Sequence, residues 1–409
     1  MGMADRRYDL VLFGATGFTG RLVAEYLARH AAGTSLAWAL GGRNAAKLER
    51  VRAELAAIDA ACAELPIVEA DALDAAAMAR VVAQTRVVCT TVGPYAQYGT
   101  ALVAACARAG THYCDLAGEV PWIRSSIDAN HDEARRTGAR IVHCCGFDSI
   151  PSDLGALFLQ QQLIDRCGAP AAAVTALFGE NSGKFSGGTV ASLLGVIDAA
   201  ARDRAVRRML GDPHGLDPEG GPRSAARDAR APGWDRVLRV PTAPFVMAAI
   251  NTRVVRRSHA LLGYPWGTDF VYDERMSLPR SPRGVATAVA ITGALAGFVA
   301  ATQVPALRRQ LEKRLPGPGE GPNAEERARG YYVVRLHGEA AGTRLIAKVA
   351  DQLDPGYGGT AKMLGEAALC LAEDELASGG GVLTPASAMG LTLVARLVNA
   401  GVTFEIVEH

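Results

Sequence analysis

The chain carries almost no net charge, since its 43 lysines and arginines are matched by 42 aspartates and glutamates. Proteins that bind nucleic acid through its phosphates need an excess of basic residues on one face. The charge balance therefore disfavours nucleic acid as a partner. The length of 409 residues is enough for two or three domains with substantial hydrophobic cores.

The sequence also lacks the cysteine spacings that build metal sites or disulfide frameworks. Its eight cysteines form no C-x-x-C pair and follow no regular spacing. We therefore predict free thiols in a reducing compartment and no bound metal. No apolar signal segment precedes the first predicted strand, which favours the cytoplasm as the location.

One long segment has no charge of either sign: residues 284–307 are apolar, small or neutral polar. As a helix this segment is long enough to cross a bilayer. Three interpretations stay open: a helix buried in the core or an interface, a lipid-facing helix with membrane contact through residues 284–314, and a spanning helix. The flanking charges do not orient a span, because they are basic on both sides. They are Arg280 and Arg283 before the segment, and Arg308, Arg309 and Lys313 after it.

A glycine-rich segment near the start is the most informative feature. An apolar run over residues 10–13 predicts a strand, and apolar residues with helical spacing follow the glycines. In such a turn the first glycine permits the bend and the second lets the backbone approach a diphosphate. The third lets the helix pack against the strand, and the helix N-terminus favours the negative charge. We therefore predict a dinucleotide cradle formed by Gly14, Ala15, Thr16, Gly17, Phe18, Thr19 and Gly20.

The choice of dinucleotide depends on Arg43. It follows a second predicted strand (36–40), at the place where NAD enzymes usually carry an acid for the ribose 2′-hydroxyl. A guanidinium instead suits a phosphate, both in charge and in its planar fork of donors. We therefore predict NADP(H) over NAD(H). Asn44, which would also cap the next helix, and Asp71 on the adenine side are further predicted cofactor contacts.

Alternating strands and helices predict a doubly wound, mostly parallel sheet. Ligands bind such sheets at the carboxyl ends of the strands. The residues expected near the nicotinamide ribose are therefore Thr91, Gly93, Pro94 and Tyr95. The remaining strands of this sheet are predicted over residues 66–70, 87–92, 111–115 and 140–144.

The pattern changes after residue 173, where strands follow one another without long helices between them. We predict a second α+β domain on an antiparallel sheet, with one hairpin turn at residues 337–342. Residues 211–234 and 316–322 are predicted loops. The predicted strands span residues 174–178, 245–255, 269–272, 331–336 and 343–349.

Several motifs taken together resemble the saccharopine dehydrogenase-like oxidoreductases. They are GATGFTG (14–20), VGPY (92–95), HYCDLAGE (112–119), GFDSIPSD (146–153), SGGTVASLL (186–194), PGPGEGP (316–322) and GVLTPASAMG (381–390). The similarity is greatest to the branch of the trans-acting enoyl reductases and the lipid-droplet saccharopine dehydrogenase-like protein. The resemblance implies NADP(H), a Rossmann domain over residues 1–150 and a substrate and dimerisation domain over 151–355. It also implies C-terminal helices over 356–409 that pack back on the Rossmann domain.

A nicotinamide enzyme that reduces C=C or C=N needs a proton donor in a dry site. The hydroxyls of Tyr95, Tyr113 and Ser149 lie at predicted strand ends, where they could stabilise negative charge on a substrate oxygen. Carboxyls such as Asp115 and Asp153 also lie there, and would act as acids if burial raised their pKa, or would merely cap helices. No Tyr-x-x-x-Lys pair supports a short-chain dehydrogenase mechanism. The predicted catalytic residues are Tyr95, Glu119, Asp148 and Ser149.

Three functions compete at this point. The first is an NADPH-dependent reductase of a lipid-like or polyketide-like enoyl substrate, which the family branch and the uncharged segment favour. The second is a saccharopine-type dehydrogenase that acts on an amino-acid imine. The third is a non-catalytic NADP(H)-binding protein at lipid surfaces. A homodimer is expected only because dimers are the commonest soluble assembly.

Overall fold

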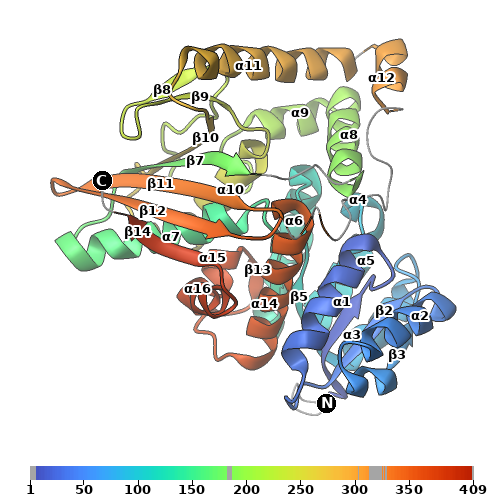
Figure 1. Ribbon diagram of the computed structural model, residues 1–409. Coiled ribbons are helices and arrows are strands. Elements are labelled where there is room, and N and C mark those ends of the chain that lie inside the picture. The colour runs from blue at the N-terminus through green and yellow to red at the C-terminus, as the bar shows by residue number, and fades with distance from the viewer. Residues whose placement is uncertain are drawn as a thin grey trace.

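The computed structural model describes residues 6–181, 187–302, 304–312, 325, 327 and 329–407. Within these ranges, two seven-stranded sheets form the framework (Figure 1). The chain builds the first sheet with its N-terminal part and most of the second sheet afterwards. The last two strands are divided between them, since β13 (Gly381–Leu383) joins the first sheet and β14 (Thr403–Val407) the second.

The first sheet is parallel throughout, with the order β13-β6-β5-β4-β1-β2-β3. From central β1 the chain builds β2 and β3 on one side, and then returns to build β4, β5 and β6 on the other. This confirms the predicted doubly wound Rossmann sheet, with each predicted strand displaced by at most two residues at either end. The strands are β1 (Tyr8–Phe13), β2 (Trp38–Gly42), β3 (Ile67–Glu69), β4 (Thr85–Thr90), β5 (His112–Cys114) and β6 (Arg140–Val142).

The connecting helices begin where side chains can cap them. The Asn44 side chain accepts a hydrogen bond from the backbone N–H of Lys47, and Asp74 accepts bonds from Ala76 and Ala77. These caps satisfy N–H groups that have no partner within a helix. The helices of this part are α1 (Phe18–Ala31), α2 (Ala45–Ala56), η2 (Ala60–Glu64), α3 (Ala75–Ala83), α4 (Tyr95–Tyr98), α5 (Thr100–Ala109) and α6 (Val120–Thr137).

The second sheet has the order β14-β12-β11-β7-β10-β9-β8 and is mixed. Its pairs are antiparallel except β7 with β10, which is parallel, so the sheet differs in this one pair from the expected antiparallel arrangement. The predicted hairpin turn is shorter than expected, because β11 continues to residue 340 and only Ala341 and Gly342 turn. The strands are β7 (Ala173–Asn181), β8 (Gly233–Asp235), β9 (Val240–Pro244), β10 (Val271–Ser277), β11 (Tyr332–Ala340) and β12 (Thr343–Asp351).

The predicted strand over residues 245–255 is wrong, because most of it belongs to helix α10 (Ala248–Leu261). A short apolar run does not distinguish a strand from a buried helix. Even the three arginines of α10 are buried, and their guanidinium groups donate to backbone carbonyls of residues 210, 213 and 216. The predicted loop at 211–234 is therefore held against α10, and its last residues form β8.

Two helices connect the sheets. Helix α7 (Ile150–Cys167) leaves the end of β6 and packs against β11 and β12, whereas α14 (Thr360–Glu373) packs against α1 and β4. The domain division at residues 150 and 355 stays a prediction. The other helices are α8 (Gly187–Arg202), α9 (Arg204–Gly211), α12 (Pro305–Glu312), η3 (Pro355–Gly359), α15 (Pro385–Ala388) and α16 (Gly390–Asn399).

The uncharged segment forms helix α11 (Pro282–Thr302), which lies along one edge of the molecule (Figure 1). Of the helices described, it is the one long and apolar enough to cross a membrane, yet only 11% of its most apolar window is buried. The interpretation as a helix buried in the core is therefore wrong, and the interpretations as an interface helix, a lipid-facing helix and a spanning helix stay predictions. The predicted loop at 316–322 lies outside the described residues.

A buried polar network joins α7, α10 and β10. The hydroxyl of Ser149 donates to the side-chain oxygen of Asn251, whose amide nitrogen donates to Glu274 at 2.7 Å. Ser152 and Tyr272 donate to the other carboxylate oxygen of Glu274 at 2.9 and 3.1 Å. The carboxyl is nevertheless wholly buried, and burial raises the pKa of Glu274 to about 7.

Glu274→Gln should make the free energy of unfolding less dependent on pH. The folded protein holds this proton more tightly than the unfolded chain, whose glutamate pKa is 4.5. The contribution of this proton to the free energy of unfolding is therefore complete below pH 4.5 and is lost as the pH rises through 7. Denaturant unfolding at pH 5 and pH 8 should show that the wild type loses about 2 kcal/mol more than the variant. The exposed Glu64→Gln should behave as the wild type, and parallel curves for Glu274→Gln would contradict the expectation.

Candidate functional site

The glycine-rich turn lies where the strand order reverses, between the carboxyl ends of β1 and β4. Gly14 adopts a φ of 94°, in the region that favours glycine, and the Thr91 hydroxyl donates to its carbonyl at 3.2 Å. In open α/β sheets this reversal point is where dinucleotides bind. The turn and the end of β4 therefore form one site.

The three glycines of the turn have different steric surroundings. A Cβ at Gly20 would lie 2.1 Å from the Gly14 carbonyl oxygen, and one at Gly14 would lie 2.7 Å from the Val92 side chain. Both positions thus need glycine for the fold itself. A Cβ at Gly17 would meet nothing closer than 3.4 Å, and Gly17 is exposed. The space beside Gly17 is therefore open to a ligand that touches the backbone.

Helix α1 begins at this open space without a side-chain cap. Its N-cap is Gly17, and its first turn contains no acidic residue. The first N–H groups of a helix without a cap, together with its dipole, favour a diphosphate. The cradle fits a dinucleotide, with Thr16 and Thr19 half-exposed on the same turn and Ala15 buried beneath it.

The polar side chains after β2 and β3 differ in whether other groups of the protein already bind them. Arg43 is exposed, and within the described part of the chain its guanidinium makes no hydrogen bond or ion pair, which leaves it available for a phosphate. The Asn44 side-chain oxygen instead accepts the Lys47 N–H at 2.9 Å as the cap of α2. Asp71 accepts the backbone N–H of Leu73 at 2.9 Å and is exposed.

Two predicted catalytic residues hold the loops after β4 and β5 together. Glu119 accepts the backbone N–H groups of Tyr95 and Ala96, which follow Gly93 and Pro94, and also the Ser192 hydroxyl. The Tyr95 hydroxyl donates to the Thr90 carbonyl at 3.2 Å and accepts the Leu116 N–H at 3.1 Å. Burial raises the pKa of Tyr95 well above its usual value. This geometry commits both side chains to hydrogen bonds that hold the loops, and their catalytic roles stay a prediction.

Asp148 differs from the other candidates at this edge. Ser149 is fully buried and its hydroxyl is committed to Asn251, whereas no hydrogen bond or ion pair engages the Asp148 carboxyl within the described residues. Asp148 is half-buried, and burial raises its pKa to about 6. A carboxyl in this state is part protonated near neutral pH, as a general acid requires.

An aromatic cluster adjoins Asp148. The ring of Phe147 packs edge-to-face on Phe178 of β7 and on Tyr332 of β11, with ring centroids 6.1 and 4.6 Å apart. Phe178 in turn stacks on Phe245 at 4.3 Å. Sequence reasoning missed this wall, because its four members come from four separate segments and carry no local motif. Asp148 directly follows Phe147 of this wall in the chain.

Residues 355–360 connect this wall to the cofactor turn and were also missed. Tyr357 packs edge-to-face on Phe18 at 4.7 Å, and the Thr360 hydroxyl accepts the Phe147 N–H at 3.2 Å. One short segment thus touches both the first residue of α1 and the residue before Asp148. The two halves of the site are therefore held together.

Asp115 stabilises the turns at the same edge of the sheet through hydrogen bonds. Its carboxylate accepts the Tyr113 hydroxyl and the backbone N–H groups of Ala117 and Cys144, and lies 2.7 Å from Nδ1 of His143. These partners fix the turns after β5 and β6, which carry Glu119 and Asp148. Asp153 has a similar structural role, since it accepts bonds from Ser258 and from the Ala386 N–H.

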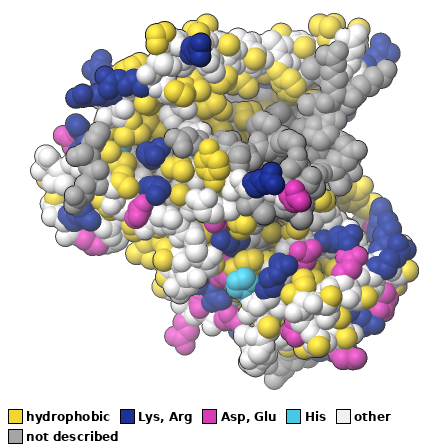
Figure 2. All heavy atoms as spheres, in the orientation of Figure 1, with side chains coloured by type: hydrophobic (Ala, Val, Ile, Leu, Met, Phe, Trp, Pro, Cys, Tyr) yellow, Lys and Arg dark blue, Asp and Glu magenta, His cyan; other side chains and the backbone are white. Residues whose placement is uncertain are grey.

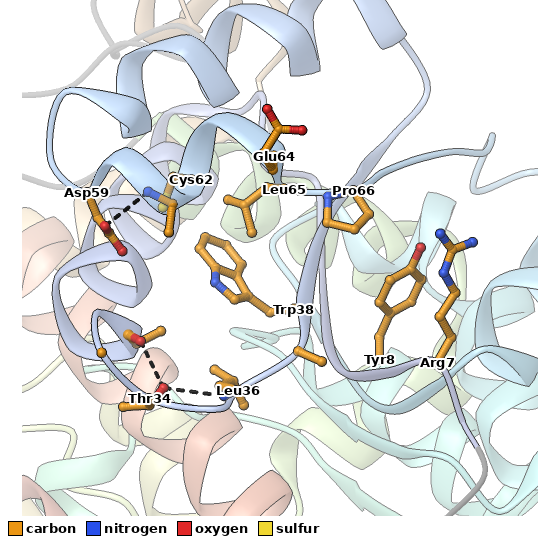
Figure 3. Close-up of a pocket in the computed structure, with 14 residues that line it drawn as sticks. Arg7, Tyr8, Thr34, Leu36, Trp38, Asp59, Cys62, Glu64, Leu65 and Pro66 are labelled. Atoms are coloured by element: carbon orange, nitrogen blue, oxygen red, sulfur yellow. Dashed lines mark hydrogen bonds between the residues drawn. The ribbon is translucent and has the colours of Figure 1, made fainter.

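A separate pocket of about 380 Å³ opens at the other edge of the first sheet (Figure 3). It is lined by Tyr8 and Trp38, the first residues of β1 and β2, and by Thr34, Asp59 and Glu64. Cofactors bind at the carboxyl ends of such strands. This pocket therefore lies away from the glycine turn and Asp148.

Gly17→Ala should fold normally but lose affinity for NADPH, because its Cβ would fill space that only a ligand uses. We expect the dissociation constant to rise at least about tenfold, the cost of one lost backbone contact to phosphate. Titration by fluorescence and thermal unfolding would measure both properties. Gly20→Ala is the contrasting control, since its Cβ clashes with the Gly14 carbonyl and should lower the unfolding temperature. Unchanged NADPH affinity in Gly17→Ala would contradict this assignment.

Arg43→Ala should weaken NADPH binding by about 10- to 100-fold, the usual value of a charge-assisted hydrogen bond to phosphate. NADH has no 2′-phosphate, so its affinity should change by less than about threefold. Arg50→Ala, an exposed arginine on α2, is the matched control. A similar loss for both cofactors would mean that Arg43 does not read the 2′-phosphate.

Comparison with known proteins supports an NADP(H) site in the N-terminal part of the chain. Residues 10–142 match the family model for the saccharopine dehydrogenase NADP binding domain. A putative trans-acting enoyl reductase of Mycobacterium tuberculosis H37Rv is 43% identical over 99% of both chains. A trans-acting enoyl reductase of Mycobacterium bovis BCG is 41% identical over 98% of both chains.

Among solved structures, saccharopine dehydrogenase (L-Glu forming) of Saccharomyces cerevisiae matches with a TM-score of 0.50 and 13% identity. The match covers 98% of this chain and 99% of that one, and at this identity it shows a shared fold alone. The family model and the full-length relatives carry the assignment further. The chain belongs to the saccharopine dehydrogenase family and is an NADP-dependent oxidoreductase of the kind represented by the trans-acting enoyl reductases.

Proposed function

We propose that this protein reduces the C=C bond of a lipid-like or polyketide-like enoyl substrate with NADPH, and that Asp148 is the proton donor. The observation that carries the proposal is the Asp148 carboxyl, which has no partner among the described residues and has a pKa raised to about 6. It follows Phe147 of the aromatic wall and lies on the edge of the sheet that carries the glycine turn. The full-length relatives, which are named trans-acting enoyl reductases, support the reaction class.

The chemistry divides between cofactor and protein. NADPH supplies a hydride to the β-carbon of the enoyl group, which places negative charge on the α-carbon and the carbonyl oxygen. The neutral Asp148 carboxyl transfers its proton to the α-carbon and becomes a carboxylate. Hydride and proton together saturate the double bond, and solvent returns the proton to Asp148. A pKa near 6 suits this cycle, since the group can both give and regain a proton near neutral pH.

The wall next to Asp148 favours an apolar substrate. Phe147 and Phe245 are partly buried rings that pack on the buried Phe178 and Tyr332, and the cluster has none of the charged groups that an amino-acid imine would require. Aromatic surfaces bury acyl chains well, and every methylene that they cover adds about 0.8 kcal/mol. We therefore expect activity to rise with acyl-chain length, whereas an imine dehydrogenase would show no such dependence.

Asp148→Asn should lower kcat by about 10²- to 10⁴-fold and leave the NADPH dissociation constant within about threefold of the wild type. NADPH oxidation with trans-2-enoyl thioesters of increasing chain length measures both kcat and the length dependence. Because the protonated form of Asp148 is the active one, the wild-type kcat should fall as the pH rises through about 6. The kcat of the variant should not show this decrease with pH.

The exposed Asp165→Asn at the other end of α7 is the matched control and should keep both the rate and the pH profile. A wild-type rate in Asp148→Asn would exclude Asp148 as the acid. Turnover of an amino-acid imine without turnover of any enoyl thioester would replace the proposed substrate class. Tight NADPH binding without oxidation across both panels would instead favour a non-catalytic binding protein.

A further inference from the structure

Helix α11 presents an apolar face to the outside of the molecule. Its buried residues are Gly284, Ala288 and Thr302, which lie on one side of the helix. The part of the helix surface that faces outwards carries valines 46–57% exposed at positions 285, 289 and 299, with alanines and glycines between them. A surface helix of a water-soluble protein would normally turn charged residues to this side. The exposed side of α11 therefore suits an apolar medium.

Both ends of α11 are held against the same folded body. At its start, Gly284 lies so close to β9 that a Cβ there would be 3.2 Å from the Pro241 ring. Beyond its end, Arg308 of α12 forms a two-pronged ion pair with Asp198 of α8. The helix consequently lies flat along the edge of the molecule (Figure 1). A spanning orientation would require one of these attachments to cross the bilayer.

Basic side chains flank this face at both ends. Arg280 and Arg283 are exposed at the start of the helix, and no hydrogen bond or ion pair of their side chains occurs in the described part of the chain. Arg309 is exposed beyond the other end. Figure 2 shows hydrophobic side chains along this edge and basic side chains towards its two ends. An apolar strip between basic ends matches an anionic bilayer, with acyl chains below and phosphate headgroups around.

We propose that α11 and the start of α12 bind the surface of an anionic lipid bilayer, with α11 parallel to the membrane plane. A second copy of the chain fits this face less well. Two α11 helices paired along their length would bring arginine-flanked ends together, whether they ran parallel or antiparallel. Each such pairing places like charges side by side, whereas anionic headgroups neutralise both ends.

The test is flotation of the full chain with vesicles of phosphatidylcholine alone or mixed with phosphatidylglycerol in equal parts. The wild type should float with the anionic vesicles, and more weakly as salt is raised. Val289→Asp combined with Val299→Asp should abolish flotation, because it places carboxylates on the face that enters the lipid. Val398→Asp, an equally exposed helical valine on α16, is the matched control and should float as the wild type.

Charge is tested separately from apolar contact. Arg280→Glu with Arg283→Glu should lower the partition coefficient on anionic vesicles by about tenfold or more. Arg80→Glu with Arg108→Glu makes the same change in net charge on α3 and α5 and should have no such effect. NADPH titration of every variant checks that it is folded.

The proposal does not rest on the enoyl reductase assignment, since flotation needs no substrate. A wild type that stays unbound with both vesicle types would overturn it. So would flotation that survives the paired aspartates on α11. A dimer in light scattering that the same aspartates dissociate would assign the face to a second copy instead.

Discussion

The site depends on a contact that leaves no room for a side chain. Helix α1 begins so near the end of β1 that a Cβ at Gly20 would lie 2.1 Å from the Gly14 carbonyl oxygen. This approach points the N-terminus of α1 at the reversal point of the sheet. The Gly14 carbonyl also receives the Thr91 hydroxyl, so the end of β4 is positioned by the same turn. One backbone contact thus places the phosphate cradle and the nicotinamide side together.

The carboxyl edge of the first sheet carries two carboxylates that hold turns in place and a third, Asp148, that has no hydrogen-bond partner among the described residues. Asp115 and Glu119 each accept several hydrogen bonds and hold the turns after β4, β5 and β6 in place. A partly buried carboxyl without partners is less stable in its charged form, and groups perturbed in this way are found mainly at functional sites. Within the described residues Asp148 is in this position, next to an aromatic wall.

The parts of the structure that local chemistry determines could be predicted from the sequence. The parallel strands, the glycine turn and the place of Arg43 after the second strand each follow from a few consecutive residues. The environment of a side chain could not be predicted, because it depends on segments far apart in the chain. Glu119 and Asp148 looked alike as strand-end acids, yet only the folded chain brings the N–H groups of Tyr95 and Ala96 to one of them. The α10 error has the same origin, since an apolar run reports burial and not conformation.

The uncharged segment is a second case in which the environment could not be predicted. Its composition predicts a long apolar helix but does not show whether protein, lipid or water surrounds that helix. In the structure α11 packs on β9, and Phe245 of the aromatic wall directly follows β9. If α11 rests on a bilayer, the lipid surface lies on the side of the second sheet, and the first sheet lies away from it (Figure 1). A charged dinucleotide dissolves in water, whereas an apolar acyl chain dissolves in lipid. In this orientation the dinucleotide would reach the site from the aqueous side and an acyl chain from the lipid side. Exposure of an apolar helix destabilises a protein in water alone, and contact of α11 with a bilayer would remove this cost.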